Sequence, residues 1–450
     1  MHMTETENRG KNQISVRDIL FFVWPIMLAN ILQITFNFAD TLVVGNYVSN
    51  EGLAAVGATS PITIFFNWGL NGLSLGANVL ISRMIGARNS EKLPRAVFSA
   101  IAIGLFFGTG IALFGFVFSK QMLELFSAPE DILLQAASYM RVFFLASIAI
   151  GVFDFGASVL RADGNTRIPT LYLAIAGALN VILNYVFVAV FCMGVIGAAW
   201  ATVISQFTGA ILIIARLLRE KGTIALIPDL SLLDKDMVVT MLKYGIPSAL
   251  QNQLFSFSNM IIQSSINSFG SDFVAANTAA NAIEEYVYVF VDAFPLASLT
   301  FVSRLYGAGE YRQIKGLTFK TFLLCGIGAF MIGLVILLNG EFLLGLLSDD
   351  LSIIAMGMIR LRCVTFFLFL NGLLDVIVNS SRGMGMVNAP TIVTLIGVCG
   401  FRLLYIYTYF ASHHSPEVLF RCFPFSWILT MSLQLIIWIY RYRQVSELQG

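Results

Sequence analysis

Six acidic residues lie inside stretches of the chain that are otherwise almost wholly apolar. They are Asp40, Asp154, Glu284, Glu285, Asp292 and Asp375. A charged side chain at the centre of a bilayer costs about 2.5–3.5 kcal/mol on insertion scales, so it must be paired, neutralised or in contact with a wet cavity. Carboxylates in such positions bind protons or cations, and transport is the chemistry that they indicate.

Asp40 belongs to a polar stripe on an apolar segment. Gln33, Asn37 and Asp40 are separated by four and three residues in QITFNFAD, which places them on one face of a helix. This spacing favours a water-filled substrate cavity lined by all three, in which Asp40 binds a proton or a cation. A position at the membrane interface, near the end of the first span, is the alternative for Asp40.

A second group of acids lies close to a proline. Glu285 and Asp292 are seven residues apart and share a helix face, whereas Glu284 is turned about 100° away from Glu285. All three therefore cannot point the same way, and we expect Glu285 and Asp292 to line the substrate cavity. Pro295 interrupts the same span, and broken helices often mark binding sites in transporters.

Two further patterns combine polar residues at helical spacing. Asn180 and Asn184 are four residues apart in ALNVILNYV and share a face, so they are either hydrogen-bonding residues between helices or ligands. Asp375 precedes Arg382 by seven residues, and the same spacing recurs in the first half of the chain. The repeat favours a structural role for Asp375, in which its carboxylate holds Arg382 in a loop. A cation site at Asp375 is the alternative.

The composition is that of a membrane protein with many spans. Of the 450 residues, 57% are hydrophobic and 12% charged, against about 25% charged in soluble domains. The net charge of +1 gives no indication of nucleic-acid binding. The five cysteines lack CxxC spacing, and the sequence contains neither HExxH nor GxSxG. We therefore expect no metal site, no cofactor and no enzyme activity.

Apolar runs predict twelve membrane-spanning helices. Their approximate limits are 17–43, 53–81, 95–118, 133–159, 168–191, 195–218, 239–267, 274–302, 316–338, 353–380, 389–410 and 421–440. Most lysines and arginines lie in the connections on one side, together with both termini, and the opposite connections hold little beyond Lys120 and Arg421. The positive-inside rule therefore predicts a multi-pass protein of the inner (cytoplasmic) membrane with both termini in the cytoplasm.

The chain carries an internal repeat. SRMIGARNSEK at 82–92 recurs as SRLYGAGEYRQ at 303–313, and GVFDFGASVLRADGNTRIPT at 151–170 recurs with the same separation as GLLDVIVNSSRGMGMVNAPT at 372–391. We call this separation, which relates Ser82 to Ser303, the repeat offset. Symmetry at half the chain length predicts an all-α integral membrane protein. Its twelve transmembrane helices would form two six-helix lobes related by a pseudo-two-fold axis along the membrane normal.

The repeat also suggests a division of the chain. We expect an N-lobe at 1–218, a cytoplasmic linker at 219–237 and a C-lobe at 238–450. The two Ser-Arg phrases are expected to be cytoplasmic loops that act as hinges and bind anionic lipid headgroups. A sequence bias set by topology alone is the alternative for these loops.

The sequence resembles the multidrug and toxic compound extrusion (MATE) family over almost its whole length. The resemblance rests on the twelve spans in two lobes, the doubled Ser-Arg phrases, RADGNTRIPT, GAAWATVISQ and AANAIEEYVYVFVDAFPLA. Asp40 matches the first-span aspartate of the bacterial DinF-like branch, which the chain resembles most.

The resemblance implies a set of coupling residues. In the DinF-like branch an N-lobe site uses an Asp, an Asn-x-x-x-Asp and a Thr, and the corresponding residues here are Asp40, Asn180, Asn184 and Thr202. Asn184 departs from the pattern, so one carboxylate is lost. This weakens a Na⁺ cage, whereas a proton needs only one carboxyl group. Glu284 matches a glutamate of many members, and Asp375 lies in the span where Na⁺-linked members carry an aspartate; both are further candidates for cation or proton coupling.

The family resemblance implies a secondary antiporter that exports cationic amphipathic drugs or toxic compounds in exchange for H⁺ or Na⁺ by alternating access. The expected partners are organic cations, the coupling ion and membrane lipids, with no nucleic acid and a monomeric state. A lipid-linked oligosaccharide flippase of the same superfamily, or a narrow-substrate metabolite exporter, is the alternative.

Overall fold

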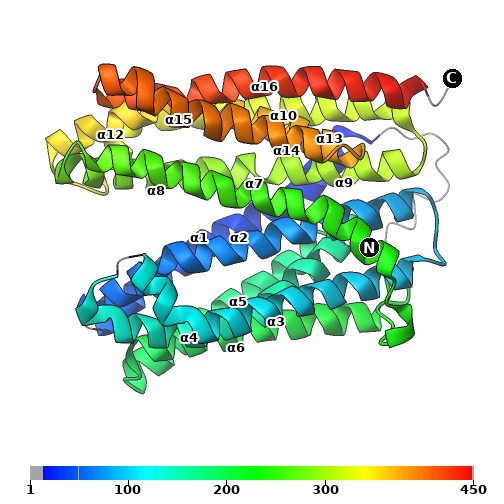
Figure 1. The fold of residues 1–450 in the computed structure, drawn as a ribbon, viewed down its shortest axis with the longest axis horizontal. Coiled ribbons are helices and arrows are strands. Elements are labelled where there is room, and N and C mark those ends of the chain that lie inside the picture. The colour runs from blue at the N-terminus through cyan, green and yellow to red at the C-terminus, as the bar shows by residue number, and fades with distance from the viewer. Residues whose placement is uncertain (1–13, 49, 127, 448–450) are drawn as a thin grey trace.

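The computed structural model describes residues 14–48, 50–126 and 128–447, and every regular element in these ranges is a helix (Figure 1). Residues 1–13 of the N-terminal segment, which is expected in the cytoplasm, lie outside these ranges. The first half contains α1 (Val16–Tyr47), α2 (Asn50–Gly86), α3 (Leu93–Leu125), α4 (Glu130–Ala162), α5 (Arg167–Asn184), η2 (Tyr185–Val190), α6 (Gly194–Arg219) and η3 (Leu230–Leu232).

The second half contains α7 (Lys235–Asn267), α8 (Ser271–Val291), α9 (Ala293–Gly307), α10 (Tyr311–Leu338), α11 (Gly340–Gly345), α12 (Leu351–Cys363), η4 (Thr365–Phe367), α13 (Leu368–Gly383), α14 (Asn388–Thr394), η5 (Leu395–Gly400), α15 (Phe401–Tyr405), η6 (Ile406–Phe410) and α16 (Pro416–Glu447). Within the described residues, eleven helical segments are long and apolar enough to cross a membrane. The twelfth, α7, is as long as its neighbours but more polar. The prediction of twelve spanning helices is thus confirmed.

Four of the described spans contain irregular turns, and one of them is the fifth span, in which the π-helical η2 follows α5. The eighth span breaks at Asp292, between α8 and α9, close to the proline that the sequence singled out. A 3₁₀-helical turn, η4, separates α12 from α13, and π-helical turns lie in the span from α14 to η6. Such irregular turns leave backbone groups free, so they are tolerated in a membrane where protein or water satisfies them.

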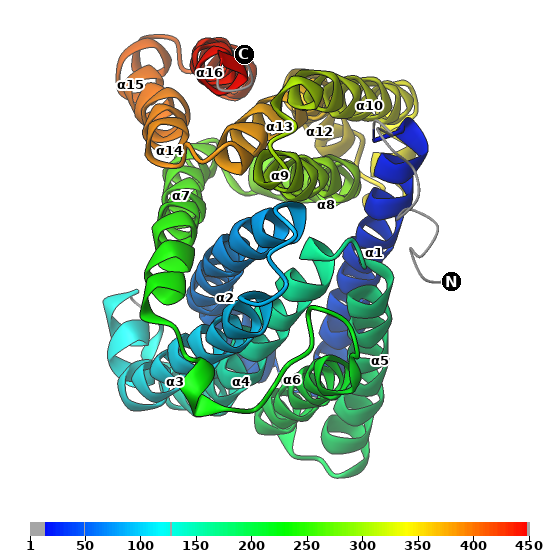
Figure 2. The ribbon, with the colours of Figure 1, turned by 90° about the vertical axis from the view of Figure 1, so that its right-hand side faces the viewer.

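The helices form two groups that meet at one end of the bundle (Figures 1 and 2). The first part of α1 shares a hydrophobic core with α9, α10 and α13, and the start of α7 shares one with α2, α3, α4 and α6. The first helix of each half therefore packs against the other half. The predicted linker at 219–237 contains η3 and ends inside the first turn of α7.

Both described ends of the chain lie at this end of the bundle, which we call the terminal end. Lys320 donates a hydrogen bond to the carbonyl oxygen of Ile14 at 3.0 Å, and Arg441 donates to that of Met384 at 3.1 and 3.3 Å. The last turns of α2, α4, α9 and α13 lie there too, and they bring the two halves into direct contact.

Two arginines join the halves by reciprocal contacts. Arg304, at the end of α9, donates to the carbonyl oxygen of Ala162 at 2.7 Å, and Arg83, at the end of α2, donates to that of Gly383 at 2.9 Å. The repeat offset relates the two arginines to each other, and it relates Ala162 to Gly383. Each arginine thus satisfies the last carbonyls of a helix in the opposite half, which have no partner within their own helix. We call these two contacts the arginine latch.

The prediction that the Ser-Arg phrases are loops is wrong for their first five residues. Ser82–Gly86 form the last turn of α2, and Ser303–Gly307 form the last turn of α9. An arginine near a helix C-terminus is favoured by the helix dipole, so a charge there does not signal a loop. Ser82 and Ser303 are fully buried. These segments are therefore part of the contact between the halves.

Glycine is required on both sides of this contact. A Cβ atom on Gly86 would overlap the carbonyl oxygen of Arg304, and one on Gly307 would overlap that of Arg83. Real Cβ atoms do not approach backbone oxygens this closely, so the two helix ends would have to move apart. The close packing of α2 on α9 thus depends on the missing side chains.

We expect Gly86→Ala and Gly307→Ala to destabilise the purified protein by about 1–3 kcal/mol, because an added methyl group meets rigid backbone. Gly316→Ala is the matched control, because Gly316 in α10 has open space at the Cβ position. Thermal unfolding in one detergent compares the three variants with wild type. An equal melting temperature for Gly86→Ala and Gly316→Ala would contradict this account of the contact.

Candidate functional site

Asp40 lies in a polar cluster formed by α1, α5 and α6. The Nδ2 atom of Asn184 donates a hydrogen bond to Oδ1 of Asp40 at 2.7 Å. Asn180, one turn earlier on α5, lies between Asp40 and Thr202 of α6. The four residues named by the family resemblance are therefore adjacent in space, and the shared face of Asn180 and Asn184 is directed at α1.

The hydrogen bonds of Asn180 depend on which of its amide atoms is assigned to the side of Asp40. With its nitrogen toward Asp40, it donates to both carboxylate oxygens, at 2.9 and 2.6 Å, and its oxygen accepts from the backbone N–H of Thr202 at 3.3 Å. With its oxygen toward Asp40, its nitrogen donates to Oγ1 of Thr202 at 3.4 Å. The first orientation suits an ionised Asp40. The second suits a protonated Asp40, which then donates to the amide oxygen.

The polar stripe on α1 is accessible. Gln33 and Asn37 are exposed, Asp40 is half-buried, and Asn30 on the same helix donates to the carbonyl oxygen of Val289 in α8 at 3.5 Å. The stripe therefore lies on a helix that contacts both halves of the bundle. The cavity position of the stripe stays a prediction.

The two acids predicted to share a face do so. Glu285 and Asp292 are exposed, whereas Glu284 is only 4% exposed. Glu285 and Asp292 lie far from both ends of the span formed by α8 and α9, and a carboxylate at that depth is not stable against hydrocarbon. Glu285 and Asp292 therefore stay candidates for lining the predicted substrate cavity. Glu284 points elsewhere, as its position in the helix predicts.

Glu284 is held in a buried ion pair that the sequence did not reveal. Nε and Nη2 of Arg360 in α12 donate to its two carboxylate oxygens at 3.0 and 3.1 Å, and the hydroxyl of Thr365 donates to it at 3.2 Å. The third nitrogen, Nη1 of Arg360, donates to Asn277 at 2.8 Å. Glu284 was proposed as a coupling residue, and this geometry gives its charge a complete set of partners that link α8 to α12.

Asp375 is less fully partnered. Nδ2 of Asn371 donates to one of its carboxylate oxygens at 3.3 Å. Arg382 acts on Asp375 electrostatically but forms no ion pair with it, and donates instead to Gln251 of α7 at 2.7 Å and Thr391 at 3.4 Å. The expected contact of the acid with the loop arginine is therefore indirect. Asp375 stays a candidate coupling residue.

The C-terminal half also holds a buried cation that no acid pairs with among the described residues. Arg402 of α15 is 5% exposed and donates to Ser426 at 3.1 Å and to Asn259 at 3.4 Å. Its guanidinium lies 4.3 Å from the centre of the Phe423 ring. Neutral hydrogen-bond acceptors and an aromatic face thus stabilise this charge.

We expect Glu284→Gln to destabilise the protein by about 3–5 kcal/mol, because it leaves Arg360 charged and buried without its carboxylate. Glu285→Gln removes the neighbouring, exposed carboxylate and is expected to change stability little. Thermal unfolding of both variants in the same detergent tests this. Similar melting temperatures for the two variants would show that the ion pair contributes little to the fold.

A family model, MatE, matches the chain twice, at 25–186 and at 247–408. The probable multidrug resistance protein YoeA of Bacillus subtilis (strain 168) is 25% identical over 404 residues, which cover 88% of this chain and 87% of that protein. The probable multidrug resistance protein NorM of Thermotoga maritima is 26% identical over 396 residues, which cover 86% of this chain and 84% of that protein.

Solved structures share the fold. One described as the outward-facing conformation of a multidrug resistance MATE family transporter of the MOP superfamily has a TM-score of 0.86 at 22% identity. It covers 97% of both chains. The two matches of the family model together span more than two thirds of the chain, and each falls on one of the two repeated halves. The chain belongs to the MatE family of membrane transporters.

Proposed function

We propose that this protein is a secondary antiporter that exports cationic amphipathic compounds in exchange for H⁺ by alternating access. One observation carries the proposal. Asp40 is a carboxylate within a membrane span that contacts only neutral hydrogen-bonding residues among those the structure describes, namely Asn184 and Asn180, with Thr202 behind them. Such a group can bind either a proton or an organic cation, and competition between the two is sufficient for exchange.

The proposal assigns the coupling ion as H⁺ rather than Na⁺. A Na⁺ ion is a hard cation that is best held by several oxygen ligands, including carboxylates. In this cluster Asn184 presents its NH₂ group to Asp40, and Asn180 can do the same. Donor groups directed at the carboxylate compete with a metal ion for its oxygens. A proton needs only a single oxygen. When the amide oxygen of Asn180 is directed at Asp40, it can accept a hydrogen bond from the protonated carboxyl group.

In this proposal the charge of the Asp40 carboxylate is sufficient to couple the two movements. Protonation of Asp40 from the outside removes the attraction for the bound organic cation, which is then released to the outside. Loss of the proton to the inside restores the carboxylate, which binds the next cation. Exchange of one proton for one monovalent cation moves no net charge. The driving force is then the pH difference, about 1.4 kcal/mol per pH unit.

The charge distribution supports a cytoplasmic position of the terminal end. Arg83, Arg304 and most other basic residues lie there, as the positive-inside rule requires for the cytoplasmic side. In this conformation the arginine latch holds the two halves together at that end. The proposed site is thus closed toward the cytoplasm, and opening of the latch is the step that would expose it there.

We expect Asp40→Asn to abolish efflux of a fluorescent cationic dye driven by a pH gradient, a loss of at least about tenfold, because proton binding is lost while the hydrogen bonds remain. Asp131→Asn removes an exposed carboxylate at the start of α4 and should transport normally. Wild-type efflux is expected to be unchanged by an imposed membrane potential. Efflux that survives in Asp40→Asn would move the coupling site to Asp375.

We expect Asn184→Asp to bring in Na⁺ dependence, because it adds a second carboxylate beside Asp40 and removes an amide donor. Dye efflux is measured at equal pH on both sides with a Na⁺ gradient, in wild type and in Asn184→Asp. Efflux of wild type under a Na⁺ gradient alone would overturn the assignment of H⁺.

The latch has its own test. We expect Arg83→Gln to increase labelling, from the cytoplasmic side, of a cysteine placed at the fully buried Ser303. The reason is that loss of the contacts to Gly383 raises the population of the state open on that side. Lys92→Gln, which changes an exposed residue of the same connection, is the matched control. Labelling that is equal in the two variants would show that the latch does not hold the closed state.

Arg402 favours a narrow-substrate metabolite exporter as the second candidate. A buried arginine paired with neutral groups suits a substrate that carries an acidic group in addition to a cationic one. Absence of efflux for several cationic dyes, with folded protein in the membrane, would favour this candidate.

A further inference from the structure

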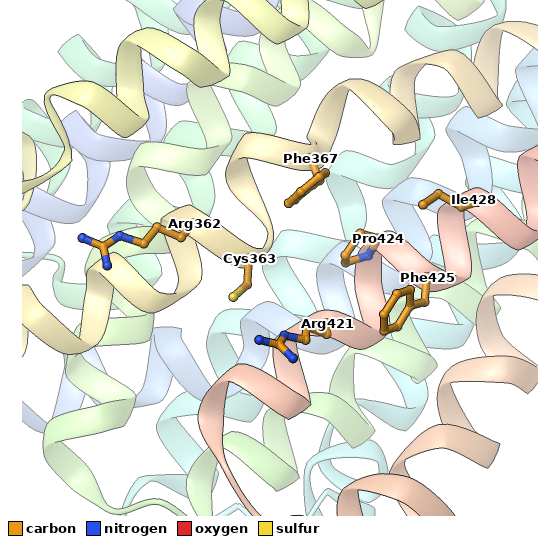
Figure 3. A pocket seen from close by; sticks show the side chains of 7 residues that line it. All are labelled: Arg362, Cys363, Phe367, Arg421, Pro424, Phe425 and Ile428. Atoms are coloured by element: carbon orange, nitrogen blue, oxygen red, sulfur yellow. The ribbon is translucent and has the colours of Figure 1, made fainter.

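The C-terminal half carries a surface crevice that takes no part in the proposed antiport. A crevice of about 320 Å³ lies between α16 and the junction of α12 with η4 (Figure 3). Arg362 and Arg421 lie toward one end of it, with their guanidinium groups pointing the same way, and Phe367, Phe425 and Ile428 lie toward the other. The crevice is therefore amphipathic, with two cations at one end and an apolar lining at the other.

Local backbone irregularity explains why the two helices leave a crevice here. Pro424 lies inside α16, where its ring removes one backbone hydrogen bond of the helix. On the opposite wall, the 3₁₀ turn of η4 interrupts the span. Neither wall is a regular α-helix at this level, so the two surfaces do not close on each other.

Arg362 and Arg421 lie at the depth of the lipid headgroups in the membrane. Arg421 and Arg441 both lie on α16. Arg362 and Arg382 lie on the span formed by α12, η4 and α13, and they are separated by the same number of residues as Arg421 and Arg441. This separation, about 20 helical positions, corresponds to about 30 Å, the thickness of the hydrocarbon core. Because Arg441 and Arg382 lie at the terminal end, Arg362 and Arg421 lie at the opposite boundary of the hydrocarbon.

The two guanidinium groups are available for a ligand. Arg362 and Arg421 are both exposed, and neither has a hydrogen bond or an ion pair with any residue that the structure describes. Glu417 precedes Arg421 by one helical turn and forms no ion pair with it. The only other exposed lysine or arginine residues in the outer half of the described chain are Lys120, which pairs with Glu124, and Arg141.

The pair is specific to one half of the protein. The repeat offset relates Arg362 to Arg141, but it relates Arg421 to Trp200. The fold therefore does not require two arginines at this position. An arginine is present at this position in both halves, and in the C-terminal half a second arginine and the crevice accompany it.

We propose that this crevice binds an anionic phospholipid of the outer leaflet, with the phosphate at the end that holds Arg362 and Arg421 and an acyl chain against Phe367 and Ile428. Arginine is suited to phosphate because its planar group donates two hydrogen bonds at once. A second positive charge beside it favours a headgroup with net negative charge over a zwitterionic one. The inference rests on the orientation given with the proposed function, and on no part of the coupling site.

The test is a lipid titration followed by native mass spectrometry of the full chain. The probes are dioleoylphosphatidylglycerol and dioleoylphosphatidylcholine. We expect wild type to retain phosphatidylglycerol about tenfold more tightly than phosphatidylcholine. In Arg362→Gln/Arg421→Gln this preference should disappear. Arg141→Gln is the matched control, because it removes the equivalent single arginine of the other half, and it should keep the preference.

Two results would overturn the proposal: an undiminished preference in the double variant, or an equal loss of preference in Arg141→Gln, which would indicate a general effect of surface charge. The single variants Arg362→Gln and Arg421→Gln are titrated as well, so that a folding defect in the double variant does not decide the outcome. Dye efflux through Asp40 is measured separately, so failure of the lipid site is distinguishable from failure of the proposed antiport.

Discussion

A helix that ends against packed protein leaves carbonyl oxygens that need a donor, and in this protein the donor comes from the opposite half of the chain. Arg304 satisfies the end of α4, and Arg83 satisfies the end of α13. The close approach of α2 and α9 at Gly86 and Gly307 brings these arginines within reach. The rest of the architecture depends on this reciprocal capping, because it fixes how the two halves meet at the terminal end.

The same rule, that a polar group in the membrane needs a partner, separates the acids by role. Glu284 has an arginine, a threonine and almost no exposed surface, so it links helices. Asp40 has only neutral amides around it and remains accessible. Asp40 corresponds to Ile261 by the repeat offset and to Ile262 by the starts of the two family-model matches, at 25 and 247. The C-terminal half thus has no carboxylate at the equivalent place, so the fold repeats but the proposed coupling residue does not.

Much of this could be predicted from the sequence, because the signals are local. Apolar runs predicted the twelve spans, and the spacing of Asn180 and Asn184 placed both on the face that contacts Asp40. The partner of Glu284 could not be predicted, because Arg360 lies 76 residues away and no periodicity relates them. The Ser-Arg phrases were assigned to loops because charge is rare in this chain, but their arginines lie in helix ends and contact the opposite half.

The reciprocity of the latch also bears on how such a chain arose. In a symmetric homodimer, residue i of one subunit contacts residue j of the other, and j contacts i in return. The two contacts of the latch follow this rule. The contact of Arg83 with Gly383 and that of Arg304 with Ala162 become the same contact, because the repeat offset relates Arg83 to Arg304 and Ala162 to Gly383. A six-helix ancestor with both ends on one side of the membrane could have formed the same contact with a second copy of itself. Duplication and fusion of its gene would then have joined two subunits that were already complementary, and freed each copy to lose or keep its carboxylates independently.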